Sequence, residues 1–195
     1  MPSAEEVQKY PASIWLESQG RSYVRGSVLD VGCGSAPYRR LFPDCEWHGL
    51  DVRPVGEYQA DAHQMPLEDD TFDTVFCTEM LHLCPAPLLV VKECARVLKP
   101  GGHLVVTVPN TYQDDDTALW DIKKRGLDYL FAACGLSGVV LASSGKLFSN
   151  EFSDYSNFSK YQISIPEIAG WLDHMDSRYP CVTLGVARKE VAPDA

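Results

Sequence analysis

The sequence has no long apolar run, and stretches such as Leu88–Val91 are far shorter than the ~20 residues that a membrane span requires. Its first twenty residues lack the basic start and apolar stretch of a secretory signal peptide. The seven cysteines include no Cys-x-x-Cys pair and no Cys/His spacing typical of a metal site. We therefore expect a cytoplasmic chain with reduced cysteines, no membrane span, no disulfide framework and no bound metal.

Positive charge is also scarce, because 17 lysines and arginines face 27 aspartates and glutamates, giving a net charge of −10. Binding to a nucleic-acid backbone requires clustered basic side chains, so this balance argues against nucleic acid as the main partner. A small-molecule partner remains open, and the sequence indicates no oligomeric state. At 195 residues and 45% hydrophobic content, residues 1–195 are predicted to form one domain that begins with a helical segment over 1–25.

Strand-like and helix-like segments alternate along the chain, which predicts an α/β fold with a mostly parallel sheet and helices on both faces. Helices are expected at Pro37–Phe42, from Pro85 or Pro87 through Leu98, and at Arg125–Cys134, where Gly135 follows as a stop. Strands are expected at Ser27–Val31, Glu46–Asp51, Tyr58–Ala60, Phe72–Cys77, His103–Val108, Gly138–Ala142 and Cys181–Ala187.

The segment before the last predicted strand, residues 147–180, is longer than a simple connection needs and is rich in aromatic side chains. One interpretation is a lid that, together with the N-terminal stretch around Trp15, covers the acceptor cavity of an enzyme. A packing appendage or a subunit interface is an equally good interpretation of the same composition.

The most informative motif is Val28–Gly34, a strand that ends in Asp-x-Gly-x-Gly. Gly32 and Gly34 carry no Cβ, so a ligand can lie directly against the main chain at the carboxyl end of the strand. The dinucleotide fingerprint Gly-x-Gly-x-x-Gly needs glycine at position 37, where this chain has Pro37. Asp30, just before the first glycine, indicates a cationic group on the ligand.

Two further acidic positions follow at predicted strand ends. Asp51 comes 21 positions after Asp30, the spacing at which a carboxylate on the neighbouring strand binds ribose hydroxyls. Asp61 and Ala62 follow the third strand, where a carboxylate and a backbone N–H can bind adenine. Each aspartate alone has the alternative of a turn-forming residue, but three in order favour a nucleoside-containing cofactor.

Four consecutive segments of the chain resemble motifs of class I S-adenosylmethionine-dependent methyltransferases, specifically the type 11 group. They are VLDVGCG, GLDV, DAHQMPLEDDTFDTVFCTEMLHL and ECARVLKPGGHLVVTVPN, which together span residues 28–110. The resemblance implies a Rossmann-like, seven-stranded sheet whose last strand is antiparallel, with S-adenosyl-L-methionine as cofactor. It also implies contacts to the methionine end of the cofactor by Asp30, Gly32 and Gly34, to the ribose by Asp51, to the adenine by Asp61 and Ala62, and beside the methionine by Thr78.

The expected reaction is methyl transfer to an oxygen, nitrogen or carbon atom of a small-molecule acceptor. His82, after the fourth strand, is the candidate base, although a histidine that packs on a helix face is the plainer interpretation. Trp15, Tyr112 and Trp120 are candidates for lining the acceptor site. The alternative is a cofactor-binding protein of the same fold that catalyses another reaction or activates a partner.

Overall fold

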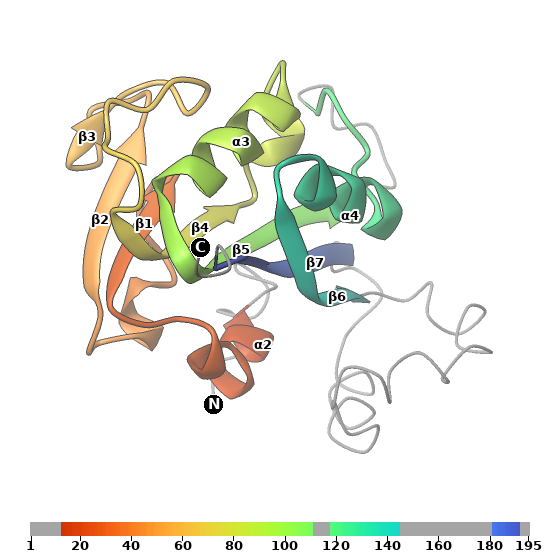
Figure 1. Cartoon of the computed structure of the whole chain (residues 1–195), viewed down its shortest axis with the longest axis horizontal. Coiled ribbons are helices and arrows are strands. Elements are labelled where there is room, and N and C mark those ends of the chain that lie inside the picture. The colour runs from red at the N-terminus through yellow and green to blue at the C-terminus, as the bar shows by residue number, and fades with distance from the viewer. Residues whose placement is uncertain (1–12, 111–117, 145–180, 192–195) are drawn as a thin grey trace.

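The computed structural model describes residues 13–110, 118–144 and 181–191, which form a seven-stranded sheet in the order β3-β2-β1-β4-β5-β7-β6 (Figure 1). Strands β1 to β5 pair in parallel, and β7 pairs antiparallel with both β5 and β6. The predicted seven-stranded α/β fold with an antiparallel last strand is therefore confirmed. The strands are β1 Ser27–Val31, β2 Glu46–Asp51, β3 Tyr58–Gln59, β4 Phe72–Thr78, β5 Leu98–Asn110, β6 Leu136–Ser144 and β7 Cys181–Lys189.

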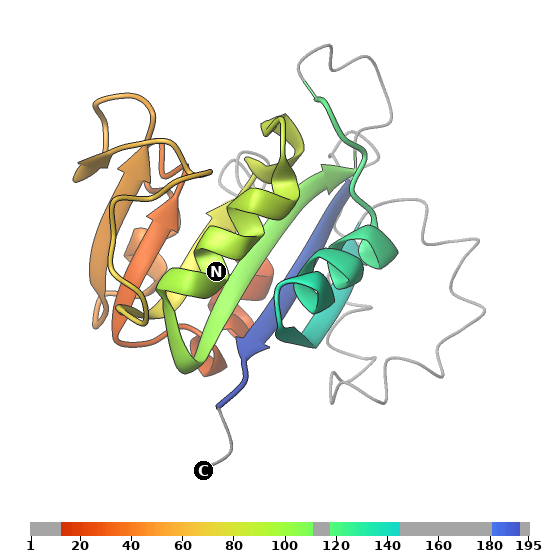
Figure 2. The same ribbon diagram turned by 45° about the horizontal axis from the view of Figure 1, so that its top comes forward.

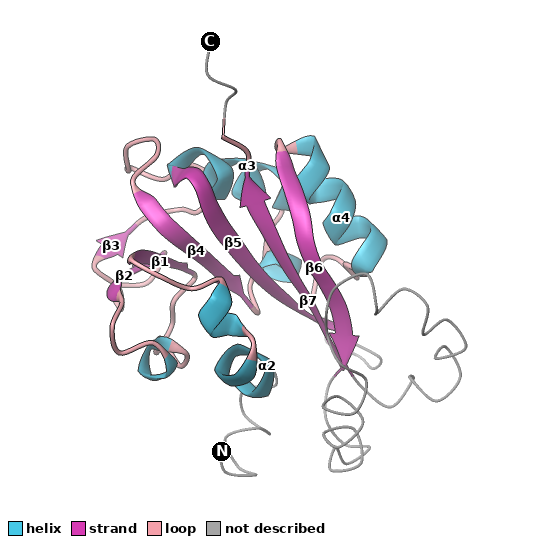
Figure 3. Ribbon diagram, turned by 60° about the horizontal axis from the view of Figure 1, so that its bottom comes forward, coloured by secondary structure: helices cyan, strands magenta, loops and turns pink. Residues whose placement is uncertain are grey.

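Helices cover both faces of this sheet. Helices α3 (Pro87–Val97) and α4 (Lys124–Ala133) lie on one face, and α2 (Ser13–Ser18) lies on the other (Figures 2 and 3). Side chains alternate between the two layers, so Leu29 of β1 packs in the cluster on the α3 side and Val28 packs in the cluster on the α2 side. Within the described residues, no helix is both long and apolar enough to span a membrane.

The strand order reverses beside β1. The chain first passes from β1 outward to β2 and β3, and then returns to add β4 and β5 on the other side of β1. The connections that follow β1 and β4 therefore leave the sheet in opposite directions and open a crevice at the carboxyl ends of these two strands. Open α/β sheets bind their ligands at this position.

Several predicted boundaries differ from the structure by one or two residues, and two differ more. The helix expected at residues 37–42 is only a single 3-10 turn, η2 (Arg39–Leu41), because Pro37 and Pro43 leave too few residues between them for a second turn. Strand β5 begins at Leu98 rather than His103, although its register with β4 is interrupted after Leu98. Gly101 lies in this irregular stretch with φ +78°, a conformation that favours glycine. The turn expected before His103 is therefore present as an irregularity within β5.

Candidate functional site

The glycine turn after β1 is fixed to the end of β2 by backbone hydrogen bonds. The N–H groups of Gly32 and Cys33 both donate to the carbonyl of Leu50, at 2.8 and 3.1 Å. Gly32 has φ +71° and Gly34 has φ +51°, so both use the left-handed conformation that glycine adopts readily. A Cβ on Gly32 would lie 2.8 Å from Cγ of Met80, so the crowding at this glycine already comes from the loop after β4.

Asp30 is a buried carboxyl on the α2-side face of β1, with 1% of its surface exposed. Among the described residues, its side chain receives one hydrogen bond, from the indole N–H of Trp47 on β2, at 3.3 Å. Burial raises the pKa of Asp30 to about 7, the Trp47 hydrogen bond opposes that rise, and the charge of Asp51 adds to it. A cation placed against Asp30 would relieve this cost, so the site is suited to a positively charged ligand group.

Asp51 ends β2 and is also buried, but its carboxylate is fully engaged. Oδ2 accepts hydrogen bonds from the N–H of Gly34 and from Nη2 of Arg53, both at 3.0 Å. Oδ1 accepts hydrogen bonds from the N–H and Nε of Arg53, at 2.9 and 3.0 Å. The side-chain hydrogen bonds from Arg53 are the main reason that the pKa of Asp51 falls to about 2. Asp51 therefore stays ionised, as binding of ribose hydroxyls requires.

Asp61 and Ala62 follow β3, as the sequence predicts. Asp61 is exposed and accepts hydrogen bonds from the N–H of His63 at 2.9 Å and from its Nδ1 at 2.6 Å, which lower the pKa of Asp61. Ala62 is buried in the α3-side cluster. The structure thus gives Asp61 the turn-forming role named as its alternative, and its contact with adenine stays a prediction.

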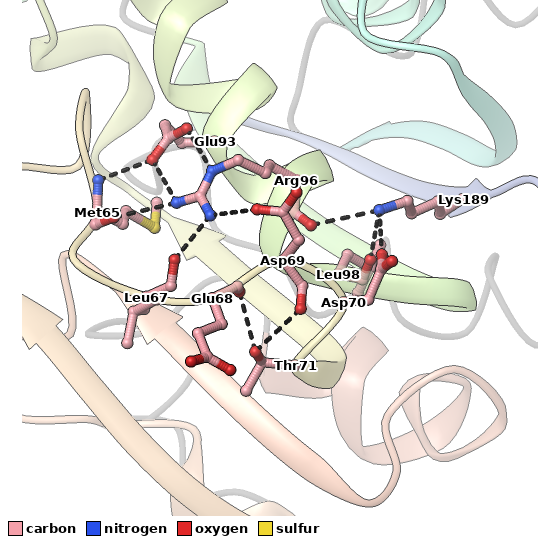
Figure 4. A network of polar contacts seen from close by, with 10 residues as sticks. All are labelled: Met65, Leu67, Glu68, Asp69, Asp70, Thr71, Glu93, Arg96, Leu98 and Lys189. Carbon is pink, nitrogen blue, oxygen red and sulfur yellow. Dashed lines mark hydrogen bonds and ion pairs between the residues drawn. The ribbon is translucent and has the colours of Figure 1, made fainter.

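The loop after Asp61 is held against α3 by one arginine (Figure 4). Arg96 donates to both carboxylate oxygens of Glu93, to the carboxylate of Asp69 and to the carbonyls of Met65 and Leu67, at 2.7 to 3.0 Å. Glu93 also accepts the N–H of Met65 at 2.8 Å. These bonds fix the position at which the chain leaves the turn at Asp61 and returns to β4.

The end of β4 carries the other predicted residues of the site. Thr78 is the last residue of β4 and pairs with Thr107 of β5. His82 is buried in the 3-10 turn η3 (Leu81–Leu83), and its carbonyl accepts the N–H groups of Leu119 and Trp120 at 2.9 and 3.2 Å. The indole N–H of Trp120 also donates to the carbonyl of Cys84 at 2.8 Å. The structure therefore brings His82 and Trp120 together beside β4.

The remaining acceptor candidates are not at this edge or are not described. Trp15, in α2, stacks on Tyr23 with ring centroids 6.0 Å apart and belongs to the α2-side cluster. Tyr112 and residues 147–180 lie outside the described residues. In the part of the chain that is described, no group of three metal-ligating side chains lies together, and the expectation of no metal stays a prediction.

Three residues near the site were missed by the sequence analysis: Trp47, Arg53 and Glu79. Trp47 and Arg53 contact the two buried aspartates, and Arg53 lies two residues after Asp51, a spacing at which its N–H can close a turn on the carboxylate. Glu79 directly follows β4 and has φ +52°, an uncommon conformation for a residue other than glycine. No sequence pattern indicated that conformation.

Residues 29–106 match the family model described as a methyltransferase domain. A ubiquinone biosynthesis O-methyltransferase from Aliivibrio fischeri is 42% identical over 142 residues, which covers 71% of this chain and 53% of the relative. A fatty-acid O-methyltransferase from Mycolicibacterium smegmatis is 32% identical over 126 residues, which covers 55% of this chain and 46% of the relative. The chain thus spans about half the length of the curated relatives that it matches.

Solved structures share the fold at low sequence identity. A Bacillus halodurans C-125 protein assigned as a methyltransferase superposes with a TM-score of 0.68 at 19% identity, covering 92% of this chain and all of the other. Phosphoethanolamine N-methyltransferase 2 of Haemonchus contortus, in complex with S-adenosyl-L-methionine, has a TM-score of 0.61 at 14% identity, covering 93% of this chain and 53% of the other.

Proposed function

This chain belongs to the class I S-adenosylmethionine-dependent methyltransferases, and we propose that it transfers the methyl group of its cofactor to a small-molecule acceptor. The observation that carries the proposal is Asp30, a buried carboxyl beside a glycine turn at the point where the strand order reverses. Burying a carboxylate there destabilises the protein without a ligand, and a bound cationic group would offset that cost.

The residues at the crevice fit the parts of S-adenosyl-L-methionine. Asp30 would bind its ammonium group, and Gly32 and Gly34 would let its methionine end lie against the backbone. Asp51, ionised and at the end of β2, would accept the ribose hydroxyls after Arg53 gives up part of its contact. Thr78 would lie beside the methionine end, and Asp61 and Ala62 would contact the adenine.

The bound cofactor supplies a methyl group that is already activated by a positive sulfur. The task left to the protein is to hold both partners in line and to exclude water from the reacting atoms. His82 and Trp120 flank the exit of β4, and we assign them to the acceptor side of the site. A base is required only where the acceptor carries a proton that it does not release unaided.

Calorimetry with S-adenosylmethionine, S-adenosylhomocysteine and NADH tests the cofactor assignment. Both adenosyl ligands should bind, and Asp30→Asn should weaken their binding, whereas stronger binding of NADH would contradict the proposal. Production of S-adenosylhomocysteine in the presence of an acceptor tests the reaction. Tight cofactor binding without turnover of any acceptor would favour a cofactor-binding protein with another role.

The proposal also covers the domain organisation, partners and cellular location of the enzyme. We place residues 1–195 in one methyltransferase domain that acts on a free small molecule, without nucleic acid. Six of the seven cysteines are free thiols, and three of them, Cys77, Cys84 and Cys94, are buried together in the α3-side cluster, which supports a reducing compartment such as the cytoplasm. Secretion of the active protein with these thiols oxidised would contradict that location.

A further inference from the structure

Glu79 occupies the first position after β4, at the carboxyl end of the sheet. Its N–H donates to the carbonyl of Thr107 at 2.9 Å, which extends the pairing of β4 with β5 by one residue. Its φ of +52° then turns the chain away from the sheet and into η3. Glutamate gains nothing from this conformation, which costs about 1 kcal/mol relative to a right-handed one. Strained residues of this kind gather at functional sites.

Glu79 is half-buried, its Oε1 atom is shielded from solvent, and its carboxyl forms no ion pair within the described residues. Its Oε1 atom has no hydrogen-bond partner among the described residues. Burial raises the pKa of Glu79, and the hydroxyl of Thr107 opposes that rise. A structural glutamate at such a depth is normally held by an arginine, a lysine or several N–H groups, as Glu93 is by Arg96 and the N–H of Met65.

Thr107, whose carbonyl accepts the N–H of Glu79, faces the same layer of the molecule as Asp30. Along β5, Val106 and Val108 pack in the α3-side cluster, so Thr107 between them points to the α2 side. Asp30 points to the α2 side because its neighbours Leu29 and Val31 face α3. The Thr107 side chain, which lies close enough to lower the pKa of the Glu79 carboxyl, therefore points to the face where the cationic end of the cofactor is expected.

We propose that Glu79 accepts the proton of a neutral hydroxyl group on the methyl acceptor, and that the enzyme therefore prefers hydroxyl acceptors to carboxylate acceptors. This inference rests on the proposed function. The acceptor oxygen forms a bond to the methyl carbon while the bond from that carbon to sulfur breaks, leaving its electron pair on sulfur. The hydroxyl proton passes to the Glu79 carboxylate and then to water, so charge and atoms balance.

The preference follows from charge. A hydroxyl group can donate its hydrogen bond to the unpartnered oxygen of Glu79, and it needs a base to become a good nucleophile. A carboxylate acceptor has no proton to donate, and placing it beside Glu79 would bring two negative charges together in a buried site. The same side chain thus assists one class of acceptor and repels the other.

Two probes distinguish these classes without knowledge of the natural acceptor: catechol, which presents neutral hydroxyl groups, and octanoate, which presents a carboxylate. Binding of each probe to the protein loaded with S-adenosylhomocysteine is measured at pH 8 for the wild type, Glu79→Gln and Glu79→Asp. Glu68→Gln is the matched control, because Glu68 is exposed and its carboxylate forms no hydrogen bond with the other residues drawn in Figure 4. Glu79→Gln should weaken catechol binding at least fivefold and strengthen octanoate binding.

Kinetics supply the second readout. Glu79→Gln should lower kcat with catechol by about 100-fold or more, the range expected for loss of a general base, and should remove the rise of rate with pH. Glu79→Asp should recover part of both. Affinity for S-adenosylhomocysteine should stay within twofold of the wild type in each Glu79 variant. Failure of the wild type itself to bind S-adenosylhomocysteine would contradict the proposed function rather than the role of Glu79.

Three results would overturn the assignment of Glu79. The first is that Glu79→Gln changes catechol and octanoate binding equally. The second is that the wild type methylates octanoate but not catechol. The third is that the wild type binds S-adenosylhomocysteine but does not methylate catechol. His82→Gln is run in parallel. Loss of the pH-dependent rise in that variant, with the rise intact in Glu79→Gln, would assign the base to His82.

Discussion

Replacing Asp30 by asparagine should stabilise the protein without ligand and at the same time weaken cofactor binding. In the unfolded chain this carboxyl ionises near its ordinary pKa of 3.8, whereas in the folded chain it ionises near 7. Between these values folding takes up a proton, so the free energy of unfolding falls as the pH rises and levels off above about pH 7. Asparagine keeps the shape and an acceptor for Trp47, and it never ionises.

The size of the effect follows from the two pKa values. Each pH unit of difference corresponds to about 1.36 kcal/mol, so a fully ionised Asp30 destabilises the fold by roughly 4 kcal/mol at pH 8. At pH 5 the same carboxyl is protonated in the folded chain, and the cost is only about 2 kcal/mol. For a chain of this length, the difference at pH 8 corresponds to an increase in Tm of roughly 10 °C.

Urea unfolding of the wild type and Asp30→Asn at pH 5 and pH 8 measures this difference. Asp44→Asn is the matched control, since it removes the same charge from an exposed turn. With saturating S-adenosylhomocysteine the stability advantage of Asp30→Asn should shrink by about 1.4–2.7 kcal/mol, because the ammonium group stabilises ionised Asp30 and not asparagine, and the affinity should fall about 10- to 100-fold. A stability difference that does not change with pH would refute the burial argument, and an unchanged affinity would remove Asp30 from the site.

Three further variants test the surroundings of Asp30. Asp51→Ala should weaken cofactor binding by about 1–3 kcal/mol, the loss of charge-assisted hydrogen bonds, and unchanged calorimetric affinity in a folded variant would exclude it from the site. Arg53→Ala should strengthen cofactor binding a few fold, because it removes the group that competes with ribose for Asp51, and weaker binding would show instead that Arg53 contacts the cofactor. Arg96→Met should lower the free energy of unfolding by about 2–3 kcal/mol through loss of its hydrogen bonds, with Lys92→Met on the exposed side of α3 as control.

Elements that depend on local pattern were predicted well. The buried strands β1 and β4 have apolar residues flanked by turn residues, and both were placed to within one residue. The prediction failed for residues 37–42, where Pro37 suggested the start of a helix. The segment before Pro43 is too short for one, and the backbone turns at Ala36 with φ +48°. A proline at a helix start is a local signal, and it does not show whether enough residues follow to form a helix. Here the second proline leaves too few.

The candidate site was predictable where it depends on chain order and not where it depends on contacts between distant residues. Asp30 and Asp51 lie at strand ends, which sequence spacing reveals. The hydrogen bond from Trp47 to Asp30 joins two strands in a register that no spacing rule supplies. The isolation of Glu79 is a property of its surroundings, and a glutamate in a sequence does not show whether a cation will lie beside it.

Buried Asp30 and half-buried Glu79 require different partners, and this difference determines how cofactor and acceptor are arranged in the site. Within the described part of the chain Asp30 has a hydrogen-bond donor and no cationic partner, so a permanent cation lowers its energy at any pH where the ligand is charged. Glu79 has an unpartnered oxygen in a buried setting, so a donor that can surrender its proton suits it better than a fixed cation, which would hold it ionised and weaken it as a base. A cofactor whose cationic amine lay against Glu79 would leave Asp30 uncompensated, and the arrangement is therefore stable only with the cofactor at β1 and the acceptor at the end of β4.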